Sequence, residues 1–104
     1  MFEKKIDLSN LDWEETSLFL RSKSFEQANK KVRVVEIKKG LDHPDWCKTG
    51  HIGYVLEGEF DIDFNGEIIK YKQGDILFIL TGEEQKHIPI PISEKVILFL
   101  VEEI

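Results

Sequence analysis

Apolar and polar residues alternate in short runs along much of this chain. In residues 60–64 (Phe-Asp-Ile-Asp-Phe) apolar and acidic side chains alternate strictly, which is the two-residue period of a β-strand with one buried face. Asn65-Gly66 follows directly, and this dipeptide is the strongest short-range sign of a hairpin because a type I′ turn needs positive φ at both central positions. The alternation and the turn together predict a β-hairpin over residues 60–71.

Further strand-like runs follow at short intervals and are separated by Gly and Pro. Residues 32–37 and 52–57 are rich in apolar side chains, and residues 96–101 predict a last buried strand. Residues 76–80 are apolar throughout, which predicts a strand covered on both faces or one that crosses between two sheets. Residues 88–92 contain two prolines, which lack the N–H of a ladder bond, so this extended run is excluded from the centre of a sheet.

These runs predict an all-β fold of about 8–10 short antiparallel strands with little helix, arranged as a sandwich, a jelly roll or a small barrel. About six of the strands lie from residue 31 onward, and residues 1–25 supply about two or three more. The length of 104 residues fits a single domain spanning residues 1–104.

Composition and charge narrow the range of functions. The chain has 41% apolar and 33% charged residues, as soluble globular proteins do, and a formal net charge of −6. This acidity argues against a nucleic-acid partner and against docking on an anionic membrane. The apolar runs are far shorter than the ~20 residues that span a bilayer, and no signal region follows the first residues, so we expect a cytoplasmic protein. The single cysteine, Cys47, cannot form an internal disulfide.

Two segments resemble the two motifs of small single-domain cupins. The first is residues 40–58, which end in His51-Ile-Gly-Tyr-Val-Leu-Glu-Gly and continue into Glu59. The second is residues 74–82, Gly-Asp-Ile-Leu-Phe-Ile-Leu-Thr-Gly, followed by His87. The predicted hairpin fills the gap that cupins have between the motifs. The resemblance implies the cupin double-stranded β-helix, a jelly-roll barrel formed by residues 31–104, whose mouth can hold a ligand.

The resemblance also implies a metal site, but the chain departs from the family's ligand pattern. The first cupin motif usually supplies His-x-His and then a Glu or Gln, and the second motif supplies one more His. Here His51 stands in the place of the Glu or Gln. The His-x-His place falls on residues 45–47 (Asp-Trp-Cys) or, in a second register, on residues 43–45 (His-Pro-Asp). The last His falls on Gln85, or on His87 if the loop is longer.

The side chains left in or beside the motifs are nevertheless capable of binding a metal. The candidates are His43, Asp45, Cys47, His51 and His87. Imidazole, thiolate and carboxylate groups bind Zn²⁺, and mixed sets suit other transition metals, so the two alternatives are one divalent ion, Zn, Fe, Ni or Mn, and no metal at all. If a strand runs through this region, Asp45, Cys47 and His51 share one of its faces.

Each candidate also has a purely structural interpretation. His51 and His87 can be core histidines that hydrogen-bond to a neighbouring side chain, and Asp45 can be a turn residue after a proline. Cys47 can be a small buried apolar residue, or a reactive thiol if one of the histidines acts as its base.

The two motifs, the hairpin and the adjoining loops also supply candidates for the lining of a small-molecule pocket. All of them are aromatic or aliphatic except Gln85, which has an amide side chain. The candidates are Trp46, Tyr54, Phe60, Ile62, Phe64, Phe78 and Gln85. Trp46 could stack on a ligand, but aromatic packing accounts for it equally well, and Tyr54 has a structural alternative too.

Three functions remain open on these grounds. The first, which we favour, is a cupin that binds a small molecule, a divalent metal or both in its barrel. The second is a metal-dependent enzyme of the oxygenase or isomerase type, using His51 and His87 with Asp45 or Cys47. The third is a non-catalytic structural module. Small cupins pair through sheet edges or exchanged N-terminal strands, so the resemblance implies a homodimer in which residues 1–30, and Phe2–Ile6 in particular, take part in packing.

Overall fold

The computed structural model describes residues 2–41 and 45–104, and within them it is built almost entirely of β-strands. His43, one of the predicted metal candidates, lies outside the described residues. The elements are the 3₁₀ helices η1 (Leu8–Asn10) and η2 (Glu83–Gln85), and the strands β1 (Glu14–Ser17), β2 (Leu20–Gln27), β3 (Lys30–Lys38), β4 (His51–Glu57), β5 (Glu59–Phe64), β6 (Glu67–Lys72), β7 (Ile76–Ile79), β8 (Ile88–Pro91) and β9 (Lys95–Glu103). These described elements confirm the predicted all-β fold.

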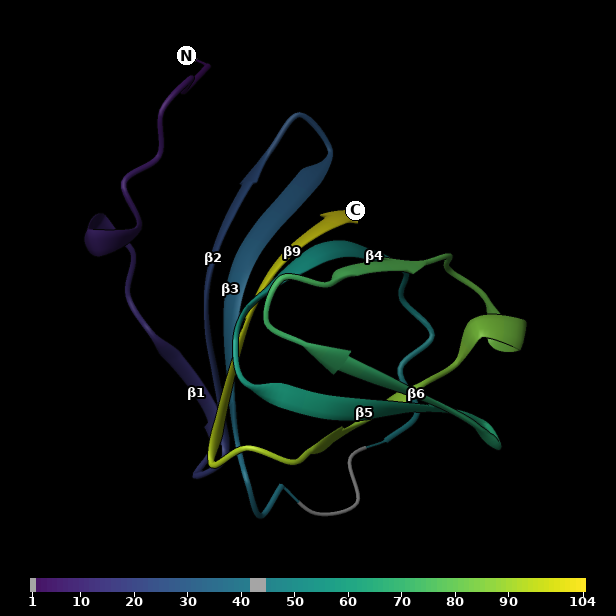
Figure 1. Cartoon of the computed structure of the whole chain (residues 1–104). Helices are drawn as coiled ribbons and strands as arrows, with labels where there is room; N and C mark the ends of the chain where they lie inside the picture. The colour runs from purple at the N-terminus through teal and green to yellow at the C-terminus, as the bar shows by residue number, and fades with distance from the viewer. Residues whose placement is uncertain (1, 42–44) are drawn as a thin grey trace.

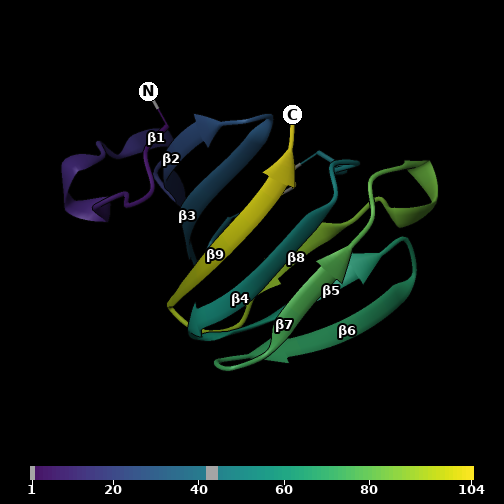
Figure 2. The ribbon, with the colours of Figure 1, turned by 90° about the horizontal axis from the view of Figure 1, so that it is seen from above.

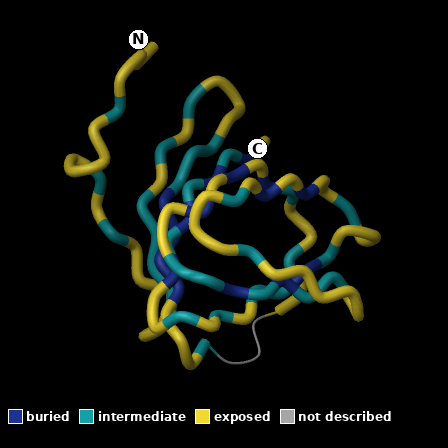
Figure 3. The backbone as a smooth tube through the Cα atoms, viewed as in Figure 1, coloured by how far each residue is buried: buried dark blue, intermediate teal, exposed yellow. Residues whose placement is uncertain are grey.

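The strands form two antiparallel sheets that face each other. The larger sheet has six strands in the order β1-β2-β3-β9-β4-β7, and the smaller has three in the order β6-β5-β8 (Figure 1, Figure 2). Val35, Val55 and Leu98 from the larger sheet meet Phe60 and Ile62 from the smaller one in a shared core. Buried positions accordingly gather along the strands where the two sheets face each other (Figure 3).

The hairpin predicted from Asn65-Gly66 is confirmed. Phe64 and Glu67 pair at the end of the β5–β6 ladder, and the two residues between them have φ angles of 59° and 113°. Both values lie in the left-handed region, which Asn and Gly tolerate and which a type I′ turn requires. Phe60 and Ile62 are buried on the inner face, as the alternation predicted.

The two prolines of β8 lie where their missing N–H groups are tolerated. β8 is an edge strand of the smaller sheet and pairs there with β5. The prediction that residues 88–92 are extended but not central is therefore confirmed.

Both predictions for residues 76–80, a strand covered on both faces and a strand that crosses between two sheets, are wrong. Leu77 and Ile79 are buried, but Ile76, Phe78 and Leu80 are about two-thirds exposed, at 66%, 68% and 64%. β7 is the last strand of the larger sheet, and only the inner side of that sheet meets the core. The continuous apolar run therefore forms a strand with one buried and one exposed face, and no alternation is visible in the sequence because the exposed face is apolar as well.

The N-terminal segment runs beside the outer side of the larger sheet (Figure 1). Residues 2–6 form no strand, and β1 pairs with β2 of the same chain. The Arg21 guanidinium lies 4.0 Å from the centre of the Trp13 ring, and the Lys23 ammonium lies 5.0 Å from it. These cation–π contacts hold the segment against β2. The described residues contain no helix with the length and hydropathy of a membrane span.

Candidate metal centre

A cavity of about 230 Å³ lies between the two sheets. Its walls are mostly aliphatic and include Leu77, Ile79 and Leu100. Among residues 2–41 and 45–104, the polar side chains on its wall are Arg33, Asp45, Cys47, His51 and His87. An apolar cavity with a few converging polar groups is the usual form of a small-molecule site.

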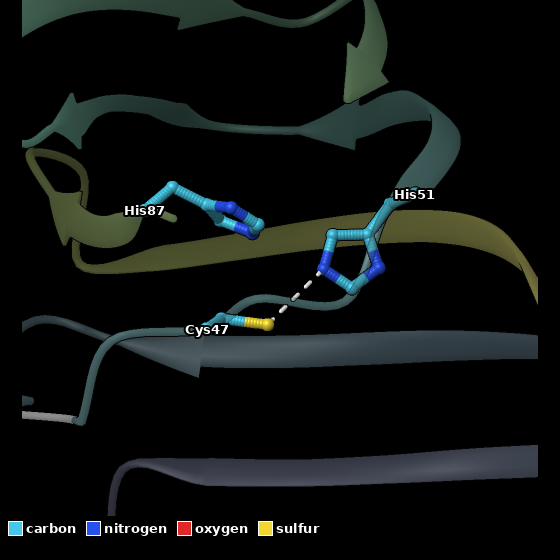
Figure 4. A group of neighbouring side chains, drawn as sticks. All are labelled: Cys47, His51 and His87. Atoms are coloured by element: carbon cyan, nitrogen blue, oxygen red, sulfur yellow. Dashed lines mark hydrogen bonds between the residues drawn. The ribbon is translucent and has the colours of Figure 1, made fainter. Parts of the chain in front are cut away.

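Three of these polar side chains converge on one point. The thiol of Cys47 and one ring nitrogen each of His51 and His87 all lie within 4.8 Å of one another (Figure 4). His51 is the first residue of β4. Cys47 and His87 are joined outside the named strands by an isolated antiparallel bridge, with two backbone N–H···O bonds of 2.9 Å. This bridge brings together two segments that are far apart in the sequence and fixes both side chains beside His51.

Contacts on both sides of the ring orient His51. Its Nε2 lies 3.6 Å from the Cys47 sulfur. Its Nδ1 forms an ion pair with Glu102 on β9. The carboxylate of Glu102 in turn accepts a 3.0 Å hydrogen bond from Nη2 of Arg33. With Nδ1 engaged by a carboxylate, Nε2 is the nitrogen that faces the cluster, which is the arrangement typical of metal-binding histidines.

His87 is oriented in a similar way, although its partner is a backbone carbonyl. Its Nδ1 lies 2.9 Å from the carbonyl oxygen of Gln85, and we assign the proton to Nδ1 because a carbonyl oxygen can only accept. Nε2 is then the ring nitrogen available to the cluster. The ring meets that of His51 edge-on, at 5.1 Å and 83°, and packs against Phe64 at 5.9 Å.

The contacts within the cluster shift the pKa values of its members. Hydrogen bonding to His51, and next to His87, lowers the pKa of the Cys47 thiol from 9.0 to about 5. For His51, burial is the largest single influence and by itself would lower the pKa, but contacts with Cys47 and Glu102 together outweigh it, so the pKa of His51 is raised. For Glu102, burial is again the largest influence and by itself would raise the pKa, but contacts with His51 and Arg33 together outweigh it, so the pKa of Glu102 is lowered. At neutral pH the lowered pKa of Cys47 therefore favours the thiolate, which is the form that binds metals, and the raised pKa of His51 favours protonation of the neighbouring ring.

We expect this thiolate to be detectable by alkylation of the metal-free protein. The rate of reaction of Cys47 with iodoacetamide should rise with a midpoint near pH 5, because hydrogen bonding to the histidines favours the thiolate. In a His51→Gln variant the midpoint should move toward 9.0, the ordinary pKa of a thiol. Mass spectrometry of samples quenched between about pH 4 and pH 9 measures both profiles. The same midpoint in both proteins would show that His51 does not stabilise the thiolate.

The structure separates the remaining predicted site residues into two groups. Asp45, Phe60 and Ile62 line the cavity, although Asp45 is not one of the three converging donors. The residues of the other group do not line the cavity, and they are Trp46, Tyr54, Phe64, Phe78 and Gln85. Phe64 packs against the His87 ring, and the other four are exposed.

Two of the exposed aromatic residues have a common explanation. Tyr54 and Phe78 alternate with the buried residues Val55 and Leu77, so their side chains point to the outer face of the larger sheet. The resemblance placed both of them in the motifs, but it did not show which face of its strand each would occupy.

Two residues of the site were missed in the sequence, Arg33 and Glu102. The signal that could have found them is the period of the strands. Arg33 lies two residues before the buried Val35, and Glu102 lies two residues after the buried Leu100, so each shares the inner face of its strand with a core residue. Charged residues are seldom buried, but in the structure these two form an ion pair beside His51.

Comparison with known proteins shows similarity at the level of structure. No family model matches the chain, and no curated protein matches its sequence. An RmlC-like cupin from Shewanella frigidimarina NCIMB 400 matches with a TM-score of 0.79 and 18% identity, over 98% of this chain and 91% of that one. KdgF from Halomonas sp. matches with a TM-score of 0.78 and 17% identity, over 99% of this chain and 96% of that one. Apo-HppE matches with a TM-score of 0.76 and 12% identity, over 93% of this chain and 56% of that one. Similarity at such identities establishes a shared fold.

Proposed function

We propose that this chain, which has the cupin fold, holds one divalent metal ion on Cys47, His51 and His87 and binds a small, mostly apolar molecule in the adjoining cavity. The observation that carries this proposal is the convergence of three donor atoms within 4.8 Å on the wall of an otherwise apolar cavity. Burying polar side chains costs free energy unless their polar atoms find partners, and one bound ion would partner all three donors at once.

The donor set fits a transition metal. One thiolate and two imidazole nitrogens match the soft and intermediate ligands that Zn²⁺ prefers, and the thiolate disfavours Mn²⁺. Both histidines have Nδ1 engaged elsewhere, so each can present Nε2 to an ion. Three protein ligands would leave a coordination position free for water or for a bound molecule. An ion held in this way supplies Lewis-acid chemistry and lowers the pKa of a bound water.

The other residues of the site would prepare it for that ion and for a small ligand. Glu102 holds the ring of His51, and Arg33 holds the carboxylate of Glu102. The aliphatic walls exclude water and favour a ligand with an apolar body. A polar atom of the ligand would then face the three donors. The cavity of about 230 Å³ limits the ligand to a small organic molecule.

Metal analysis tests the proposal directly. We expect wild-type protein incubated with Zn²⁺ and dialysed to retain one ion per chain, as measured by inductively coupled plasma mass spectrometry. The cobalt-substituted protein should show a sulfur-to-metal charge-transfer absorption that is lost in Cys47→Ser. His51→Ala and His87→Ala should each weaken the binding of Zn²⁺ by at least about tenfold.

Asp45→Asn is the matched control, because Asp45 lines the same cavity but is not one of the three converging donors. It should retain the ion and the cobalt spectrum. Wild-type protein that stays metal-free with Zn²⁺, Ni²⁺ and anaerobic Fe²⁺ would refute the proposal, as would unchanged affinity in Cys47→Ser. If the ion is bound, screening for oxygenase and isomerase activity with that ion distinguishes an enzyme from a binding protein.

A second candidate function is favoured by one specific observation. Cys47, His51 and Glu102 are arranged in the order nucleophile, base and orienting carboxylate, which is also the arrangement of thiol-dependent enzymes. If this were the function, Zn²⁺ would inhibit the reaction and would not be needed for it. A free thiol is stable in a reducing compartment, which supports a cytoplasmic location for either function. Cell fractionation tests that location.

A further inference from the structure

The outer face of the larger sheet carries a patch of exposed apolar side chains at one end. We call the outer patch the six apolar residues on that face of β4, β7 and the position after β7, namely Ile52, Tyr54, Leu56, Ile76, Phe78 and Leu80. Between 43% and 68% of each of these residues is exposed. The residues that alternate with them on the two strands, such as His51 and Leu77, are buried on the inner face.

The residues of the outer patch are adjacent across the sheet. Ile52 pairs with Phe78, and Tyr54 pairs with Ile76. On the other side of β4, Val101 of β9 pairs with Ile52, and β9 continues the same apolar face toward β3. Such cross-strand neighbours form a continuous surface, which is different from the isolated apolar residues that every protein exposes.

The size of the outer patch is that of a protein interface. From its exposed fractions the patch presents roughly 600 Å² of surface, which is the upper end of what the largest patch on a monomer usually reaches. Two such patches packed together would bury about 1,200 Å², which is the lower limit for a specific protein–protein interface.

The distribution of charge favours a second copy of this chain as the occupant. The outer patch contains no charged residue, although the chain has 14 basic and 20 acidic residues and a net charge of −6. Two copies of so acidic a chain repel each other except where their surfaces are uncharged, and an anionic membrane would repel the chain for the same reason. A regular sheet face can also pack on itself about a two-fold axis, in which case both copies use the same residues.

We propose that the outer patch is the interface of a homodimer, in which the face of β4 and β7 packs on the same face of a second copy. This assigns the interface to a sheet face and not to an exchanged strand of residues 2–6, which form no strand in the structure. The proposal is independent of the metal centre, because the outer patch and the three donors lie on opposite faces of β4.

Sedimentation velocity of the wild-type chain and of Phe78→Asp tests the interface. We expect wild-type protein at about 100 µM to sediment at twice its mass of 12.2 kDa. In Phe78→Asp, an unpaired charge at the centre of the interface should weaken the dimer by at least about tenfold. The variant should still fold, because Phe78 is mostly exposed in a single chain, and circular dichroism together with Zn²⁺ binding checks this.

Leu18→Asp is the matched control, because Leu18 is 88% exposed and lies in the turn between β1 and β2, away from the outer patch. It should remain dimeric. A wild-type chain that sediments at 12.2 kDa at the highest concentration would overturn the proposal and leave the outer patch to a different protein partner. A dimer that survives Phe78→Asp, or that is lost in Leu18→Asp, would place the interface elsewhere and overturn it as well.

Discussion

Glu102→Ala is expected to destabilise the metal-free fold by about 3 kcal/mol, because removing one partner of a buried ion pair leaves the other charges uncompensated. The Glu102 side chain is only 6% exposed, and it contacts both the Arg33 guanidinium and the His51 ring. The loss should appear as a lower urea midpoint with an unchanged slope, followed by tryptophan fluorescence in the presence of a chelator. Because Glu102 also orients His51, the affinity for Zn²⁺ should fall about 10–100-fold.

The adjacent residue provides the control for this prediction. Glu103 forms an ion pair with Lys30, but its side chain is 75% exposed, so Glu103→Ala should change stability by less than about 0.5 kcal/mol. Glu102→Gln keeps the shape of the side chain but not its charge. Its loss of stability should lie between those of Glu102→Ala and Glu103→Ala. Equal stabilities of Glu102→Ala and Glu103→Ala would mean that the buried network contributes nothing to the fold.

Phe60→Ala is expected to cost about 4 kcal/mol, because it removes a fully buried aromatic ring and enlarges the cavity. Phe60 is 1% exposed and stacks on Tyr71 with 5.4 Å between ring centres. It also lines the wall opposite the larger sheet, so the variant should gain room for a small aromatic molecule such as benzene. Urea unfolding with and without benzene measures both effects.

Phe2→Ala is the control, since Phe2 is largely exposed and its loss should cost less than about 0.5 kcal/mol. A cost below about 1 kcal/mol for Phe60→Ala would contradict the expectation and would show that the two sheets close over the space that the ring leaves.

Local features of the sequence predicted much of the fold because they depend on neighbouring residues alone. The alternation in residues 60–64 and the Asn65-Gly66 turn specify a hairpin without reference to the rest of the chain. The prolines of residues 88–92 likewise specify an edge position, because a proline cannot donate a hydrogen bond wherever the strand lies. Such signals need no knowledge of which strands pack together.

The candidate metal centre was only partly predictable, because it depends on segments that meet in space. Cys47, His51 and His87 were among the candidates, but the choice between Gln85 and His87 rested on the length of a loop. The isolated bridge between Cys47 and His87 settles their relative position, and no pattern in the sequence indicates that bridge. Glu102 was missed for a related reason, since its partner Arg33 lies on a distant stretch of the chain.

The error at β7 has a different origin. Hydrophobic patterns predict burial, and they assume that an apolar side chain is covered within its own chain. Phe78 breaks that assumption, because the residues that share its face are exposed too. In a single sequence, apolar residues on an exposed face cannot be distinguished by their pattern from apolar residues in a core.

The alternation of β4 ties two different surfaces of the molecule to one pairing register. Because successive residues of a strand point to opposite faces, one residue inserted within β4 would force one part of the strand out of register with β7 and exchange the faces of that part. If the displaced part began at His51, His51 would turn to solvent and Ile52 would enter the cavity. One change would then affect a candidate ion ligand and a proposed dimer contact together, whereas an insertion at residues 65–66, in the hairpin turn, would spare both. We therefore expect insertions to be tolerated less well within β4 than in that turn.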